Sequence, residues 1–131
     1  ISDMERIGDQ AADIAEILQY ITDAETESKS HIAEMAAAAG RMVTDAVSAF
    51  VSKDPQQAKA VMAYDDQVDG LFARVKEDLT AMILENPKNG ENCLDLLMIA
   101  KYFERIGDHA VNIAEWVMFS ITGRHEKDGR A

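Results

Sequence analysis

Two pairs of acidic residues in this chain have a spacing that could serve a metal ion. Asp65 and Asp69 are four residues apart, and so are Glu104 and Asp108. Residues four apart lie on the same side of an α-helix, so each pair would present two carboxylates to one neighbour. Two such pairs on antiparallel helices would make a compact, oxygen-rich site. Carboxylate oxygens suit hard or borderline cations such as Fe, Mn, Mg or Ca, whereas zinc more often recruits histidine or cysteine.

Asp65 and Asp69 depart from the pattern of their own helix. At about 100° per residue, both fall within its apolar stripe rather than opposite it. Acids are rarely buried unless they are paired or bind a cation. Three explanations are open from the residues alone: salt bridges, with Arg41 and Arg105 as plausible partners, exposure at the rim of a helical bundle, or a metal ion.

The chain contains the sequence Glu-Arg-Ile-Gly-Asp twice, starting at Glu5 and at Glu104. In the second copy, Glu104, Asp108 and Glu115 fall within roughly 40° of one another around the helix axis, and Asn112 lies roughly 40° beyond Asp108. A solvated helix face would explain an acidic stripe in general. Such a face does not ordinarily repeat the same acids at the same offsets, so the recurrence favours a functional stripe.

Each copy also has a glycine in the middle of its helical pattern, Gly8 in the first and Gly107 in the second. A glycine inside a helix costs about 1 kcal/mol relative to alanine. We therefore expect a neighbouring helix to approach closely at both positions. His109 is turned by about 100° from Asp108, which predicts a surface residue and not a ligand.

The second copy extends into a longer pattern. Glu104-Arg105-Ile106-Gly107-Asp108-His109, followed by Asn112-Ile113-Ala114-Glu115, resembles the signature of the PhoU family of phosphate-uptake regulators. In that family two three-helix repeats form a six-helix protein, with the signature on the third helix of each repeat. The resemblance implies that residues 1–22 are the last helix of a truncated first repeat, residues 23–123 the whole second repeat, and residues 124–131 a charged tail.

The resemblance also implies a metal site. PhoU proteins bind metal clusters through Glu/Asp-x-x-x-Asp pairs on the second and third helices of each repeat. The expected cofactor is a metal ion or multinuclear cluster, with Fe first and Mn, Mg, Ca or Zn as alternatives. The residues that match are Asp65 and Asp69 for the second helix, Glu104 and Asp108 for the third, and Asn112 and Glu115 as further ligands or as groups that hydrogen-bond to ligands.

In the first copy, Glu5 and Asp9 match the third-helix half of another site. The second-helix half of that site is absent from this chain. We expect the half-site to be empty or to be completed by a neighbouring molecule.

Helical periodicity covers the chain, and no strand pattern is found. We predict an all-α fold, an antiparallel bundle made of a PhoU-like three-helix repeat and one extra N-terminal helix. Asp54-Pro55 marks the clearest boundary, because aspartate suits the N-cap and proline the first helical position. Gly123 is placed to end the last helix. The expected helices are residues 1–21, about 24–26 to 53, 55–85 and 91–122.

Composition excludes several classes of function. The net charge of −11, with 24 acidic and 13 basic residues, disfavours direct binding to nucleic acid. The single cysteine, Cys93, cannot form an internal disulfide, which fits a reducing compartment. No apolar run approaches the roughly 18 to 20 residues of a membrane span. The chain begins with Ile1 inside a helical pattern, which we interpret as truncation.

The function that the resemblance implies is regulatory and not enzymatic. PhoU-like proteins are cytoplasmic negative regulators of phosphate uptake and of the phosphate-starvation response. They couple the phosphate ABC transporter to a phosphate-sensing histidine kinase by protein contact, and so associate with the membrane through partners. We also expect a homo-oligomer, such as a dimer, because the unpaired first helix would expose an apolar face.

Two alternatives are a cytoplasmic PhoU-like domain of a sodium/phosphate cotransporter and a carboxylate-bridged metal enzyme of the bundle type. The enzyme is disfavoured because such bundles use Glu-x-x-His, which this chain lacks.

Overall fold

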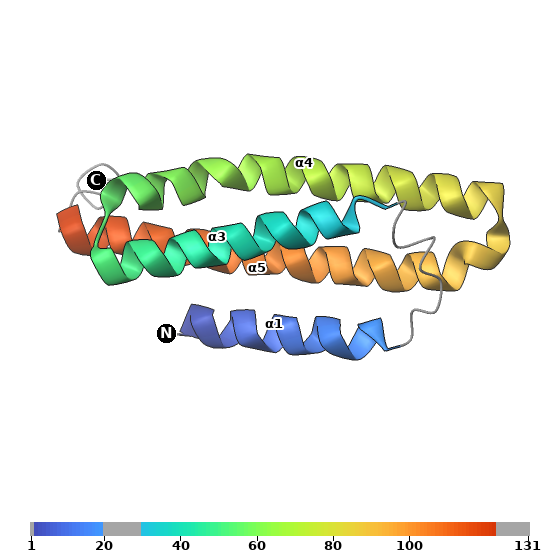
Figure 1. Cartoon of the computed structure of the whole chain (residues 1–131), viewed down its shortest axis with the longest axis horizontal. Helices are drawn as coiled ribbons and strands as arrows, with labels where there is room; N and C mark the ends of the chain where they lie inside the picture. Colours follow the sequence, from blue (N-terminus) through green and yellow to red (C-terminus); the bar gives the residue numbers. More distant parts are fainter. Residues whose placement is uncertain (1, 20–29, 123–131) are drawn as a thin grey trace, which may run out of the picture.

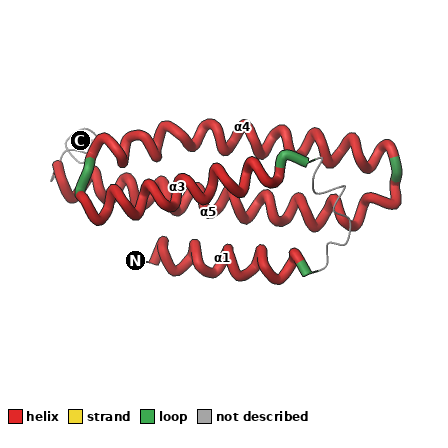
Figure 2. Tube along the Cα trace, viewed as in Figure 1, coloured by secondary structure: helices red, strands yellow, loops and turns green. Residues whose placement is uncertain are grey.

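The computed structural model describes residues 2–19 and 30–122, and every regular element among them is helical. Helices α3, α4 and α5 form a long antiparallel three-helix bundle joined by short connections (Figures 1 and 2). The prediction of an all-α antiparallel bundle is confirmed. The elements are α1 (Ser2–Leu18), α3 (Ile32–Ser52), α4 (Pro55–Glu85), the short 3-10 helix η1 (Pro87–Asn89) and α5 (Gly90–Thr122).

The connection between α3 and α4 lies where the sequence predicts it. Lys53 adopts the left-handed conformation, with φ of 56°, and its backbone N–H closes the last turn of α3. The side chain of Asp54 then caps α4, accepting a hydrogen bond of 2.9 Å from the backbone N–H of Gln56. Pro55 occupies the first turn, where no intrahelical N–H bond is lost. The chain therefore reverses within two residues.

The connection between α4 and α5 is equally tight. The side chain of Asn86 accepts a hydrogen bond of 3.1 Å from the backbone N–H of Lys88, and the amide of Asn89 donates to the carbonyl of Met82 at 3.0 Å. These bonds satisfy polar groups at the helix ends. They make α4 and α5 antiparallel neighbours along most of their length, so that the two acidic pairs can meet.

The start of α3 differs from the prediction. Helix α3 begins at Ile32, and Ser30 and His31 before it form a bend where the prediction had continuous helix. The backbone N–H of His31 donates to a carboxylate oxygen of Asp78 at 3.3 Å, and its imidazole Nδ1 contacts the same oxygen. This contact holds His31 against α4. The predicted start itself, the end of the first helix beyond residue 19 and the cap at Gly123 lie outside the described residues.

The core lies between α3, α4 and α5. Alanines on α3, such as Ala39 and Ala46, are almost fully buried and let the neighbouring helices come close. Larger side chains fill the rest of the interior at the close packing typical of proteins. Phe50, in the last turn of α3, is 43% exposed. The largest fully buried side chains include Met35, Met42, Val61, Val68, Val75, Leu96, Ile99 and Val117.

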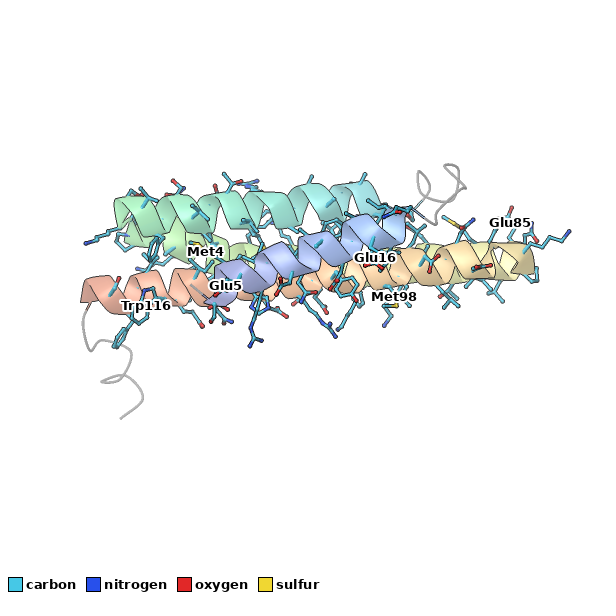
Figure 3. The ribbon with its side chains drawn as sticks, turned by 90° about the horizontal axis from the view of Figure 1, so that it is seen from below. Met4, Glu5, Glu16, Glu85, Met98 and Trp116 are labelled. Carbon is cyan, nitrogen blue, oxygen red and sulfur yellow. The ribbon has the colours of Figure 1, made fainter. Side chains whose placement is uncertain are left out.

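Helix α1 is attached to the bundle from one side. It lies against α5, on the side away from α4 (Figure 1), and crosses α5 at an angle (Figure 3). Ile14 is the residue of α1 that becomes fully buried, whereas Leu18 remains 44% exposed and Ile7 is only partly covered. The apolar stripe of α1 is therefore incompletely covered within the described residues.

Among those residues, none of the helices combines the length and the apolar character that crossing a lipid bilayer requires.

Candidate metal centre

The structure brings Asp65 and Asp69 of α4 next to Glu104 and Asp108 of α5. The four carboxylates lie on the seam between the two helices, close enough to repel one another electrostatically. Asp65 and Glu104 are half-buried, while Asp69 and Asp108 are exposed. The seam therefore opens to water. Of the three explanations for acids in the apolar stripe of α4, exposure at the rim of the bundle applies to Asp69. The spatial meeting of the two sequence pairs is as expected.

Asp65 is the most constrained member of the cluster. Its Oδ1 atom is buried and accepts no hydrogen bond from the described part of the chain. A buried polar atom without a partner is costly, so its position needs an explanation. Burial raises the pKa of Asp65 above its ordinary value, and repulsion by Asp69 and Asp108 raises it further.

Gly107 lies beside this carboxylate, where α5 packs against α3 and α4. A Cβ atom at Gly107 would stand 3.4 Å from the sulfur of Met42, 3.7 Å from Oδ1 of Asp65 and 3.7 Å from Val68. The close approach predicted for this glycine is confirmed.

The negative charges of Asp108 and Glu104 are offset to different extents by nearby positive charge. Burial raises the pKa of Asp108 most, followed by repulsion from Glu104 and Asp69, and the nearby charge of Lys101 opposes this rise only in part. Glu104 accepts a hydrogen bond of 2.6 Å from Nζ of Lys101. One cation at the edge thus partly neutralises a cluster of four acids.

The four carboxylates have the oxygen donors that a cation needs, but their side chains do not converge on one point. Within residues 2–19 and 30–122, no three acidic, histidine or cysteine side chains are arranged to hold a metal ion. The donor set is all oxygen, which suits a hard or borderline cation. The unpartnered oxygen of Asp65 and the raised pKa values of Asp65 and Asp108 mark the place where added positive charge would be most stabilising.

Two predicted members of the stripe do not join the cluster. The amide of Asn112 donates to Oδ1 of Asp3 on α1 at 3.3 Å. Glu115 is partly buried and lies about 10 Å beyond Asp108 along the helix, at 1.5 Å per residue. A contribution of either residue to the same ion would require a different side-chain arrangement.

Glu5 and Asp9 lie on α1 and are both exposed. A Cβ atom at Gly8 would have no other atom within 4 Å, so the close approach predicted there is wrong for the described residues. Within residues 2–19 and 30–122, the first copy of the motif therefore has exposed acids and no second acidic helix packed beside them.

Two polar contacts were not found by sequence reasoning. Nδ1 of His109 lies 2.9 Å from Oδ1 of Asp3, so this histidine attaches α1 to α5 rather than facing water alone. Burial opposes the shift, but hydrogen bonds from His109 and Asn112, together with the electrostatic effect of His109, hold the pKa of Asp3 below its ordinary value. The sequence offers no signal for such pairs, because Asp3 and His109 are 106 positions apart.

The arginines proposed as alternative partners of the acids are placed elsewhere. The guanidinium of Arg41 lies 4.8 Å from the ring centre of Tyr64 and 3.7 Å from Asp45. That of Arg105 lies 5.8 Å from the ring centre of Tyr102. In the part of the chain that the structure describes, neither arginine forms an ion pair with Asp65, so the salt-bridge explanation is not supported.

The fold and the site define an all-α bundle in which a signature helix and its antiparallel neighbour share a carboxylate seam. The model of the PhoU domain family matches residues 32–117, and the chain belongs to this family. The match begins at the first residue of α3 and ends within α5, so it covers the three-helix bundle.

Similar proteins agree with this assignment. Two are named phosphate-specific transport system accessory protein PhoU homologs: one from Rhizobium meliloti is 31% identical over 98% of this chain and 55% of its own length, and one from Zymomonas mobilis is 36% identical over 92% and 52%. The crystal structure of PhoU from Pseudomonas aeruginosa superposes with a TM-score of 0.85 at 30% identity, covering 92% of this chain and 59% of that one. The chain spans about half the length of the curated relatives it matches.

Proposed function

We propose that this chain is part of an accessory protein of the phosphate-specific transport system and acts as a regulator, not as an enzyme. In this role it restrains phosphate uptake and the phosphate-starvation response. It does so in the cytoplasm, by contacting the phosphate ABC transporter and a phosphate-sensing histidine kinase. The names of its relatives support the link to phosphate transport, and membership in the PhoU family supports the regulatory role.

The observation that carries the chemical part of the proposal is the unpartnered Oδ1 of Asp65 beside Gly107. A cation bound there would be held by Asp65, Asp69, Glu104 and Asp108, and Glu104 would have to release Lys101. The cation, when bound, supplies positive charge that cancels the repulsion among these acids and ties α4 to α5. Fe is the first candidate, with Mn, Mg, Ca and Zn as alternatives.

Elemental analysis tests the metal centre. We expect Asp65→Asn combined with Asp69→Asn to lower the metal content of the purified chain to near background. The helical content measured by circular dichroism should stay the same. The matched control is Glu5→Gln with Asp9→Asn on α1, which removes two acids from the same motif without touching the seam. This control should leave the metal content unchanged. Equal metal content in the seam variant and the native sequence would contradict the proposed ligands.

Binding measurements test the regulatory role. The purified chain should bind the phosphate ABC transporter in lipid nanodiscs, or the cytoplasmic part of the histidine kinase, from the organism that encodes it. Lack of binding to both would contradict the adaptor role, independently of the metal result.

Self-association is part of the same proposal. Apolar side chains on α1, including Met4 and Leu18, are exposed, so a second copy could cover them. Light scattering should give at least twice the monomer mass of 14.4 kDa. A monomer at all concentrations would contradict this prediction.

A further inference from the structure

The seam between α4 and α5 opens into a groove on the η1 side of the four carboxylates. The groove has a volume of about 460 Å³, and its lining contains no acidic residue. We call it the basic groove. Its lining consists of four apolar or aromatic side chains, Phe72, Leu97, Met98 and Tyr102, and three basic ones, Lys76, Lys101 and Arg105.

The cations of the basic groove are organised over aromatic rings. Nζ of Lys76 lies 5.6 Å, and Nζ of Lys101 5.4 Å, from the ring centre of Phe72. The guanidinium of Arg105 lies 5.8 Å from the ring centre of Tyr102. Two ammonium groups beside one ring also repel each other, so an anion placed between them would be stabilised.

Carboxylates of the chain compensate this positive charge only in part. Lys101 pairs with Glu104, whereas Lys76 and Arg105 form no ion pair across residues 2–19 and 30–122. The chain as a whole is strongly acidic, with a net charge of −11. A local cluster of basic groups that is only partly compensated attracts anionic groups, even on an acidic protein.

The groove also offers apolar surface to a partner. Met98 is 50% exposed and lies on the side of α5 that faces away from α3 (Figure 3). Leu94, one helical turn earlier on the same side, is 61% exposed. From Leu94 to Arg105 the surface extends about 16 Å along α5, which is three helical turns. Exposed apolar side chains that are bordered by charges mark surfaces that contact other molecules.

We propose that the basic groove binds an acidic amphipathic helix of a partner protein. Apolar side chains at positions i, i+4 and i+7 of that helix would contact Met98 and Phe72, and its flanking carboxylates would pair with Lys76 and Arg105. A free inorganic anion would leave the apolar lining exposed, and an anionic bilayer would repel a chain of this net charge. The inference rests on the adaptor role and specifies the chemistry of the partner.

The test uses a fluorescent 20-residue helical peptide built from Leu, Ala, Gln and Glu, with a net charge of about −6. We expect it to bind the chain, and an analogue with every Glu replaced by Lys to bind at least tenfold more weakly. In spectra of the chain with 13C-labelled methionine methyl groups, the peptide should shift the signal of Met98. The signal of Met4, exposed on α1, should not move.

Charge reversal locates the site. Lys76→Glu with Arg105→Glu should weaken peptide binding at least tenfold. The matched control, Lys59→Glu with Lys88→Glu, changes the net charge equally at exposed positions outside the groove and should weaken binding less than threefold. Circular dichroism confirms that both variants are folded. Equal affinity of the two variants, or a shift of Met4 in place of Met98, would overturn the proposal.

The same variants separate this inference from the adaptor role. Suppose that the Lys76→Glu, Arg105→Glu variant binds the transporter or kinase as well as the native chain does. That result would overturn the groove as the docking surface and would still support the adaptor role. If the acidic peptide binds at the groove but neither natural partner binds the chain, the adaptor role is contradicted and the binding of an acidic helix by the groove is supported. A shift of Met98 with chain concentration in the absence of peptide would assign the groove to a second copy and overturn the proposal.

Discussion

The two copies of Glu-Arg-Ile-Gly-Asp form the same kind of helix but have different surroundings. Gly107 is buried, and the carboxylate of Asp65 on α4 lies beside it. The environment of Gly8 is open, and Asp9 beside it is exposed. The motif by itself therefore does not create a site. A cluster of carboxylates needs a second helix that brings its own acids to the same place, and among the described elements α4 provides them for the second copy.

The largest difference between the two helices should be in how much their apolar side chains contribute to the free energy of unfolding. Leu96 on α5 is fully buried, whereas Leu18 on α1 is 44% exposed. We expect Leu96→Ala to lower the free energy of unfolding by about 2 to 5 kcal/mol, and Leu18→Ala by less than about 1 kcal/mol. Urea unfolding followed by circular dichroism measures both values. Similar losses would show that α1 is as much a part of the core as α5.

The two glycines give a more direct comparison. Gly107→Leu would push a side chain against Met42 and Val68, at a cost of about 1 to 3 kcal/mol for overpacking. Gly8→Leu meets open space and should stabilise α1 by up to about 1 kcal/mol, because leucine is the better helix former. The two substitutions should thus have opposite signs in thermal unfolding. A loss of stability in both would mean that α1 has a close neighbour outside the described residues.

The attachment of α1 to α5 should depend on His109. His109→Ala removes the contact with Asp3, which is worth about 1 kcal/mol for a typical hydrogen bond. Amide hydrogen exchange within α1 should become several-fold faster, while exchange in α4 stays the same. His31→Ala serves as the control, since His31 contacts Asp78 on α4 and its loss should leave α1 unaffected.

The smallest effect concerns pH, because Asp65 keeps partial contact with water. Burial and neighbouring acids raise the pKa of Asp65 above its ordinary value of 3.8. Between that value and the raised one, the folded chain binds more protons than the unfolded chain, so this group lowers the free energy of unfolding as pH rises. Without metal, Asp65→Asn should therefore be more stable than the native sequence at neutral pH.

That advantage should shrink as pH falls towards 3.8. Urea unfolding of the native chain and of Asp65→Asn, in a buffer that chelates metal, measures this difference in the free energy of unfolding as a function of pH. An advantage that does not change with pH would mean that the charge of Asp65 is not the cause. With a bound metal the order should reverse, since the substitution removes a ligand.

The sequence predicted the fold and the positions of the two acidic pairs on their helices because these depend on local patterns. Helical periodicity, the Asp54-Pro55 cap and the turn at residues 86–90 are properties of short segments. The spacing of Asp65 with Asp69, and of Glu104 with Asp108, determines which side of each helix carries acids. The resemblance to the PhoU signature implies that these acids lie on neighbouring helices.

The tertiary structure decided which faces meet, and this could not follow from periodicity. Asn112 shares a helix with Asp108, but its amide bonds to Asp3 on α1 because α1 crosses that side of α5. His31 ends the bend before α3 because Asp78 is nearby in space. Such contacts join residues that are far apart in the chain, and their geometry depends on how whole helices pack. The amino-acid sequence thus determined the helices and their acidic sides, and packing alone determined that Asp65 has a buried, unpartnered oxygen beside Gly107.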